Sequence, residues 1–273
     1  MSNRLLFRQT TRLPQHTSVD YQATLPFLTA NQRIGDGLAV YAQYAKGFQI
    51  PDLKSFYIAD PTKNSSDPQK STNYQLGVVG ESNALTWDVD LYKIDFKNKY
   101  VSNGLGGTDA AYVNVGGATY KGIEGQATWL VGGGFALYAN GSKNKAEASD
   151  TGKTISGSPD MTAALGLLYN AGPWAGSLIG KRTGAVYQAD YDPTRPAAYE
   201  AYRTGAYTNI DFSVAYRIAN PGLRLRTLKL QLNVFNLAGK QDVTSISPGK
   251  TAAGDQYTFQ APRSFQVSAR ADF

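Results

Sequence analysis

The sequence predicts an all-β protein, namely an antiparallel transmembrane β-barrel of about 11 strands. Apolar and polar residues alternate along many segments, most clearly at 209–218, and a period of two residues is typical of a strand with one apolar face. The predicted strands are roughly 9–15 residues long, enough to cross a bilayer at barrel tilt. Five tight turns also alternate strictly with five long loops.

The predicted strands are separated by recognisable turn chemistry. The cleanest turns are Gly35-Asp36-Gly37 and Gly132-Gly133-Gly134, where glycine supplies the backbone freedom that a reversal needs. The alternation predicts strands near residues 25–34, 38–45, 71–80, 85–92, 123–129, 135–139, 163–169, 174–178, 209–218, 228–235 and 264–273.

Loop length divides the connections into two groups. The tight turns lie at 35–37, 81–83, 131–134, 170–173 and 219–223, and the long loops at 47–70, 98–117, 142–159, 183–205 and 237–256. Tracing the strands places every turn at one end and every long loop at the other. Outer-membrane barrels have short periplasmic turns and longer extracellular loops, so the pattern favours that class over a soluble sandwich.

Composition agrees with a barrel and excludes several other classes. The mean hydropathy is −0.35, and no apolar run approaches the ~20 residues of a transmembrane helix. The chain is rich in Tyr (18) and Gly (28) and has no Cys, which excludes disulfides and thiolate metal sites. The net charge of +6 is spread along the chain rather than in a basic run, which argues against nucleic-acid binding. The excess positive charge serves either an anionic ligand or a generic solvated surface.

The sequence gives little support for a catalytic site or a metal-binding site. His16 is the only histidine, so neither a transition-metal site nor a Ser-His-Asp triad has its usual residues. The segment 176–182 lacks the spacing of a phosphate loop. Asp88 and Asp90 share one face of a strand and are expected to be lumen-facing charges. We therefore expect no enzyme activity, no cofactor and no metal.

The last ten residues carry a distinct pattern. Phe265, Val267 and Phe273 share one face with two alanines, while polar residues occupy the other face. This strand, ending in an aromatic residue, resembles the C-terminal assembly signal of outer-membrane barrels, which implies recognition by the barrel-assembly machinery. The alternative is an ordinary edge strand of a soluble sandwich.

An ordered series of blocks resembles the TonB-dependent outer-membrane receptors of the ferric-siderophore type. Gln75 departs from the pattern, because glutamate is more usual there. The blocks follow the family order and include the Leu-Asn-Val-Phe-Asn-Leu run near the C-terminus. The blocks are Leu38–Pro51, Lys70–Gly77, Tyr92–Asn98, Asn114–Gly116, Tyr120–Glu124 and Leu232–Leu237.

The resemblance implies a fold and a function for the whole protein. Family members have a 22-stranded barrel that encloses an N-terminal plug domain. Residues 25–273 would then be the C-terminal half of the barrel, and residues 1–24 a remnant of the preceding loop, with the plug absent. The expected function is TonB-dependent uptake of a scarce ligand, most often a ferric siderophore, across the bacterial outer membrane.

Two other functions remain open on the sequence. One is a passive porin-like barrel without a plug, and the other is a truncated, non-functional receptor. The N-terminus, Met1–Gln9, has no apolar stretch long enough for a signal peptide, so we expect either a mature fragment or a gene that lost its 5′ part. A soluble β-rich binding protein is a third alternative. The expected partners are outer-membrane lipid, the ligand and, through the plug, the TonB complex.

Candidate ligand contacts lie in the long loops or beside them. Aromatic faces suit flat iron carriers, and arginine pairs with anionic oxygens. We expect Tyr199, Tyr202 and Tyr207 to belong instead to the aromatic girdle at the membrane interface. The candidates are Phe48, Tyr57, Arg182, Tyr187, Tyr191 and Arg203.

Overall fold

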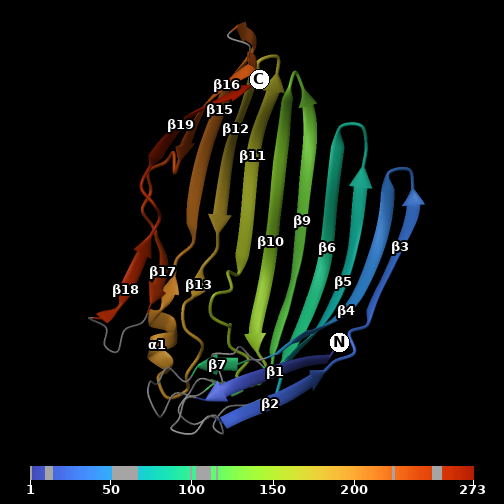
Figure 1. The fold of residues 1–273 in the computed structure, drawn as a ribbon, viewed down its shortest axis with the longest axis vertical. Coiled ribbons are helices and arrows are strands. Elements are labelled where there is room, and N and C mark those ends of the chain that lie inside the picture. The colour runs from blue at the N-terminus through green and yellow to red at the C-terminus, as the bar shows by residue number, and fades with distance from the viewer. Residues whose placement is uncertain are drawn as a thin grey trace.

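The computed structural model describes residues 2–9, 15–50, 67–98, 100–102, 112–114, 116–222, 225–247 and 254–273. Its main feature is one antiparallel sheet of eleven long strands in the order β19-β16-β15-β12-β11-β10-β9-β6-β5-β4-β3 (Figure 1). The strands are β3 (Phe27–Gly35), β4 (Leu38–Gln49), β5 (Gln69–Glu81), β6 (Leu85–Lys97), β9 (Ala118–Gly132), β10 (Phe135–Ala148), β11 (Met161–Ala171), β12 (Trp174–Thr183), β15 (Tyr207–Gly222), β16 (Leu225–Phe235) and β19 (Ser264–Asp272).

The predicted all-β, antiparallel architecture is confirmed, and each predicted strand corresponds to one strand of this sheet. Several strands are longer than the alternation indicated. β9 begins at Ala118 rather than at 123, and β10 continues to Ala148 rather than ending at 139. In both extensions lysines occupy the face that is apolar elsewhere in the strand, at Lys121 in β9 and at Lys143 and Lys145 in β10. The extensions therefore lack the apolar alternation by which a strand is recognised in the sequence.

One face of the sheet carries continuous rows of apolar residues. Leu137 pairs with Leu167, Leu167 with Leu178, and Leu178 with Phe212, so a single row crosses four strands. Leu137, Leu167 and Leu178 are all more than 40% exposed, although they lie in the middle of a sheet. An exposed apolar band of this kind is expected on the lipid-facing side of a barrel, and we call it the outer face.

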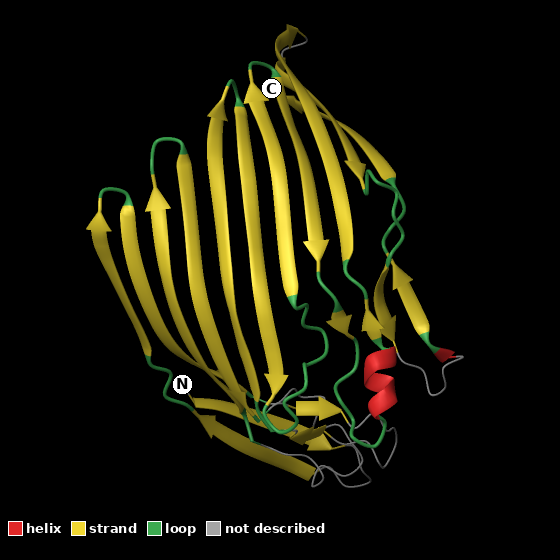
Figure 2. Ribbon diagram, turned by 180° about the vertical axis from the view of Figure 1, so that it is seen from behind, coloured by secondary structure: helices red, strands yellow, loops and turns green. Residues whose placement is uncertain are grey.

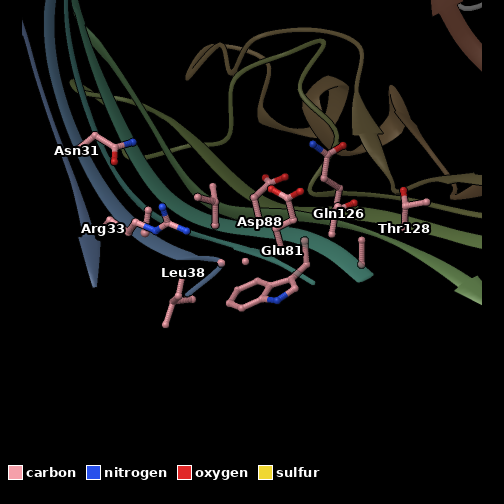
Figure 3. A pocket seen from close by; sticks show the side chains of 14 residues that line it. Asn31, Arg33, Leu38, Glu81, Asp88, Gln126 and Thr128 are labelled. Carbon is pink, nitrogen blue, oxygen red and sulfur yellow. The ribbon is translucent and has the colours of Figure 1, made fainter. Parts of the chain in front are cut away.

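The opposite, inner face is polar. Asp90 pairs with Glu124 and Glu124 with Ser142 in neighbouring strands, and the Tyr41 hydroxyl donates a hydrogen bond to Asp90 Oδ2 (3.2 Å). Figure 3 shows the two faces near the turns, with Asp88 and Gln126 projecting to one side of the sheet and Leu38 to the other. The polar and apolar sets therefore segregate by face, as a period of two requires.

The two ends of the sheet differ as predicted. The short turns after β3, β5, β9, β11 and β15 lie at one end, and the long connections gather at the other (Figures 1 and 2). Two neighbouring turns are joined by a hydrogen bond from Glu81 N to Gly37 O (2.7 Å). Gly37 has a φ of +68°, and a Cβ there would collide with the Glu81 carbonyl oxygen, so this turn requires glycine.

The loop end contains several small elements. They are the hairpin β1 (Ser2–Gln9) and β2 (Gln15–Gln22), the pairs β7 (Tyr100–Ser102) with β8 (Tyr112–Asn114), β13 (Val186–Tyr187) with β14 (Arg203–Thr204), and β17 (Val243–Ser247) with β18 (Gln256–Phe259), and the helix α1 (Pro196–Ala201). The β1–β2 hairpin is separate from the large sheet. No helix among the described residues is long and apolar enough to span a bilayer.

The large sheet is open. β3 pairs only with β4, and β19 only with β16, so in the part of the chain that the structure describes each edge strand has one free side within this sheet. Because all ten pairings are antiparallel, the two edge strands run in the same direction. This parity limits how the sheet can close.

The assignment of faces predicts opposite responses to a charge. Leu167→Arg places a cation in the apolar row and should lower the free energy of unfolding in a bilayer by about 2–4 kcal/mol. The measurement is a urea titration of the protein in phosphatidylcholine vesicles. The control is Gln126→Arg, which adds the same side chain on the inner face and should cost less than about 1 kcal/mol. Equal costs for the two variants would mean that the faces are wrongly assigned.

Candidate ligand-binding loops

The loop end contains an aromatic cluster around Tyr199. This residue is only 4% exposed, and its ring stacks on Tyr187 with centroids 4.1 Å apart and an interplanar angle of 8°. Tyr191 meets Tyr199 edge-on at 5.5 Å and 88°. Stacked and edge-to-face pairs both stabilise aromatic clusters beyond the burial of their area. We call Tyr187, Tyr191 and Tyr199 the tyrosine cluster.

Hydrogen bonds join this cluster to the neighbouring loop. The Tyr199 hydroxyl donates to the Thr154 carbonyl oxygen (3.0 Å), and the Gly157 amide donates to the Tyr187 carbonyl oxygen (2.8 Å). The Ser156 amide donates to Asp190 Oδ1 (2.8 Å). Burial raises the pKa of Tyr199 further above neutrality, and its protonated hydroxyl acts as a donor. The loop between β10 and β11 and the loop between β12 and β15 therefore form one unit.

This unit is anchored over the inner face of the sheet. Ile155 (3% exposed) packs with Ala118 and Ala146, and Phe96 and Tyr120 border the same core. Ala118 lies on the same face of β9 as Glu124, and Ala146 on the same face of β10 as Ser142, because they are separated by even numbers of residues. The loops therefore fold inward across the mouth of the inner surface rather than outward.

A third loop is attached by polar contacts. The Tyr202 hydroxyl donates to Asp255 Oδ1 (3.2 Å), and the Ser245 hydroxyl donates to Gln188 Oε1 (3.1 Å). The Gln260 side-chain amide donates to the Thr208 carbonyl oxygen (3.1 Å). Three long connections of the sheet are thus linked through described side chains.

Two exposed cations border the tyrosine cluster. Lys153 Nζ lies 5.1 Å from the centroid of the Tyr191 ring, and Arg203 Cζ lies 5.4 Å from that of Tyr187. Arg203 is held opposite Tyr187 by the pairing of β13 with β14. Cation–π contacts position each charge beside a flat apolar surface. Such a surface can bind a molecule that combines rings with anionic oxygens.

The structure brings together only part of the predicted ligand contacts. Tyr187, Tyr191 and Arg203 meet in the loop unit. Phe48 and Arg182 instead share the alternation of the outer face: Phe48 contacts Tyr21, with centroids 6.4 Å apart, and Arg182 lies 3.4 Å from Thr208 Oγ1. Tyr57 lies outside the described residues. The ligand role of all these residues remains a prediction.

Sequence reasoning missed Lys153 and misplaced Tyr199. Tyr199 was expected in the interfacial girdle, whereas it is the buried centre of the loop unit. Its partner Thr154 is 45 residues away in the sequence, and no local pattern reports such a contact. Two features of the sequence could have indicated that this loop has its own structure. They are the proline at the start of α1 and the density of tyrosines in 187–202.

The predicted assembly signal is accessible. Phe265 and Val267 lie on β19 opposite Val234 and Leu232, and both project on the apolar outer face with exposures of 67% and 80%. Phe273 follows the end of β19 and is 80% exposed. An accessible apolar edge strand is compatible with the predicted recognition by the assembly machinery, which remains a prediction.

The inner face has a hollow near the turns. It has a volume of about 670 Å³, and its polar lining includes Arg33, Glu81, Asp88 and Gln126 (Figure 3). Among the described residues, no group of three or more His, Cys, Asp or Glu side chains could hold a metal ion.

The tyrosine cluster predicts a local stability that can be measured. Tyr199→Ala removes the central ring and should lower the local opening free energy of residues 153–157 and 186–204 by about 1–3 kcal/mol. Tyr199→Phe keeps the ring and removes only the hydrogen bond to Thr154, so it should cost about 1 kcal/mol. Amide hydrogen exchange is the measurement. Unchanged exchange in the alanine variant would contradict the central role of Tyr199.

Acid should loosen the turn that leads into α1. The Thr194 hydroxyl (2.6 Å) and amide (2.9 Å) and the Arg195 guanidinium (3.1 Å) donate to Asp192, and these bonds hold the pKa of Asp192 below its ordinary value of 3.8. Because the folded-state pKa is the lowered one, the stabilisation is complete above 3.8 and is lost as the pH falls through the folded-state pKa.

The measurement is the exchange rate of the Thr194 amide as a function of pH, corrected for its intrinsic pH dependence. In the wild type, protection should fall in acid, whereas Asp192→Asn should show weak protection without this acid transition. An acid transition that persists in the asparagine variant would assign the effect to another group.

Comparison with known proteins agrees with the architecture. Residues 3–237 match the family model "TonB dependent receptor-like, beta-barrel". The vitamin B12 transporter BtuB of Photobacterium profundum is 27% identical over 224 residues, which are 78% of this chain and 34% of that protein. The chain therefore spans about a third of the length of this curated relative.

Solved structures show the same fold. The ferric yersiniabactin uptake receptor FyuA from Yersinia pestis superposes with a TM-score of 0.73 and 18% identity, covering 96% of this chain and 39% of that one. The ferripyoverdine receptor of the outer membrane of Pseudomonas aeruginosa gives 0.72 and 20%, covering 96% and 34%. With most of its length matched by the family model, this chain belongs to the β-barrel family of TonB-dependent outer-membrane receptors.

Proposed function

We propose that residues 25–273 form the C-terminal half of a closed 22-stranded receptor barrel, with residues 1–24 as part of the preceding loop region. The two edge strands of the eleven-stranded sheet run in the same direction, so an antiparallel barrel can close only through an odd number of further strands. Eleven more strands satisfy this condition and give the even total of 22 that plugged outer-membrane transporters have.

The coverage of the relatives supports this division. The chain matches 34–39% of the two structures and of the vitamin B12 transporter, which leaves room in such a protein for a further half-barrel and a plug domain. In this proposal the plug carries the contact with the TonB complex, and the terminal strand with Phe265, Val267 and Phe273 carries the contact with the assembly machinery.

The proposed activity is energised uptake of a ferric siderophore. The observation that carries it is the tyrosine cluster with Lys153 and Arg203, which presents aromatic faces and positive charge over the inner side of the loop end. Ferric siderophores combine flat or ring-bearing groups with anionic oxygens, and the two structural relatives are named for ferric yersiniabactin and ferripyoverdine. A passive porin would not need such an aromatic surface.

Uptake of radioactive iron by the host bacterium tests the proposal, with ferripyoverdine and ferric yersiniabactin as the probes and labelled vitamin B12 as a comparison. Deletion of the gene and a protonophore should each abolish uptake of one ferric probe. The double variant Tyr187→Ala/Arg203→Ala should reduce that uptake about tenfold, which corresponds to the loss of roughly 1.4 kcal/mol of binding or more.

The matched control is Arg226→Ala, which removes a cation at the turn end and should leave uptake unchanged. Uptake that persists in the protonophore would indicate a passive porin-like barrel. Uptake of vitamin B12 alone would replace the siderophore by the ligand of the curated relative. No gene-dependent uptake of any probe would contradict the proposed transport.

A further inference from the structure

Three cationic side chains form a row on the inner face of the sheet at its turn end. Arg217 on β15 pairs with Lys229 on β16, and Lys229 pairs with Arg270 on β19, so the three residues are cross-strand neighbours. Lys229 lies between the outer-face residues Leu228 and Leu230, so the alternation of the strand directs it, and the row with it, to the inner face. We call Arg217, Lys229 and Arg270 the cation row.

The cation row lies level with the short turns. The Arg217 amide donates a hydrogen bond to the carbonyl oxygen of Pro173 (2.8 Å), which belongs to the turn between β11 and β12. Directly before Arg217, Tyr216 packs edge-on against Trp174 on the outer face, with ring centroids 4.6 Å apart, as in an aromatic girdle. β19 also ends here, beside the C-terminus (Figure 1). The cation row therefore borders the mouth of the inner surface at the turn end.

The positive charge of the row is neutralised only in part. Arg217 is exposed, Lys229 is partly exposed, and the side chain of Arg270 is 78% exposed. Asp272 accepts hydrogen bonds from Arg270 Nε (3.1 Å) and from the Thr227 hydroxyl (2.7 Å). Exposed ion pairs of this kind are worth little, so Arg270 can exchange Asp272 for another anion. On the described inner face at this end of β15, β16 and β19, three cationic side chains thus face one carboxylate side chain.

Between the cation row and the loops, the inner face of these three strands is polar but uncharged. The Gln231 side-chain amide donates to Ser213 Oγ (3.2 Å) and to Asn233 Oδ1 (2.8 Å), and the Asn233 side-chain amide donates to Gln266 Oε1 (3.1 Å). Asp211, near the loop end of β15, is the next carboxylate on this part of the described wall, and its Oδ1 accepts two hydrogen bonds. Amide and hydroxyl groups solvate an anion without adding a charge that repels it.

The other flank of the inner wall carries the opposite charge. Asp88 and Asp90 lie on the inner face of β6, and Asp90 pairs with Glu124 on β9. Three strands, β10, β11 and β12, separate this acidic flank from β15, β16 and β19. An anion inside the barrel is repelled by the acidic flank and attracted by the cation row, so the field of the wall directs it to one side.

A further cation lies on the favourable side at the loop end. Lys181 on β12 is exposed on the inner face and pairs with Asn209 on β15. Asn209 and Arg217 are eight residues apart on the same strand, which is about 26 Å of extended chain. Lys181 and the cation row therefore stand at the two ends of one uncharged stretch of wall, a distance close to the thickness of the hydrocarbon core.

We propose that the cation row is a second anion site, which holds the ferric chelate as it leaves the barrel at the turn end. This inference rests on the proposed uptake of an anionic ferric siderophore. Lys153 and Arg203 border the first site in the loops, and the cation row lies at the opposite end of the wall. Arginine and lysine pair with the anionic oxygens of such a chelate. Fixed cations along a polar wall raise the local concentration of an anion and speed its passage.

The test compares binding at the cell surface with uptake, in the host bacterium that produces the complete receptor. The probe is radioactive ferripyoverdine or ferric yersiniabactin, whichever the wild type takes up. Binding is measured on ice with a protonophore, and uptake as the initial rate in energised cells. Arg217→Gln/Lys229→Gln/Arg270→Gln should leave the binding affinity unchanged and lower the uptake rate about tenfold. Arg217→Lys/Arg270→Lys keeps three cations and should retain uptake.

The matched control is Lys93→Gln/Lys121→Gln/Lys145→Gln, which removes three cross-strand cations from the outer face and should leave binding and uptake unchanged. Heat-modifiable mobility on gels checks that each variant is folded. If the triple inner-face variant fails to fold, Arg217→Gln/Lys229→Gln replaces it, because this variant keeps the ion pair between Arg270 and Asp272.

Uptake at the wild-type rate by the inner-face variant would overturn the proposal. An equal loss of surface binding would also overturn it, because the row would then act through the loops. Entry of vancomycin into cells with the inner-face variant, but not with the control, would assign the row to a contact with the plug and would likewise overturn it. Failure of the wild type to take up either probe would contradict the proposed function, and this inference with it.

Discussion

Hydrogen bonding of the backbone in hydrocarbon is the constraint on which this structure depends. A lipid-exposed strand finds no water for its N–H and C=O groups, so each strand must be paired on both sides. Nine of the eleven strands meet this requirement within the sheet, while β3 and β19 each keep one free side among the described residues. The need to pair these two edges is the reason why we propose a closed barrel that is larger than this chain.

The same constraint explains how a chain with a mean hydropathy of −0.35 can form a membrane wall. Pairing satisfies the backbone, so only one residue in two has to be apolar. Leu137, Leu167 and Leu178 supply that face, and the alternate positions are free to carry polar groups. Asp90 and Glu124 are therefore compatible with a membrane protein, because the sheet separates them from lipid.

Features that follow a repeating residue pattern could be predicted from the sequence, whereas contacts between distant loops could not. The positions of the strands, and the end of the sheet at which the short turns lie, follow from local alternation and from glycines such as Gly37. Both could therefore be predicted. The continuation of β10 to Ala148 could not, because Lys143, Lys145 and Glu147 replace the apolar side of the alternation. The buried place of Tyr199 depends on Thr154 in a different loop, and contacts between loops leave no period in a sequence.

The sheet also divides the positive charge of the loop end into two populations. Lys153 and Arg203 border the tyrosine cluster, in the loop unit that packs over the inner face. Lys93, Lys121 and Lys145 are cross-strand neighbours on the outer face instead. Charges on the two sides are separated by a wall of paired backbone, so an anion on one side does not contact lysines on the other.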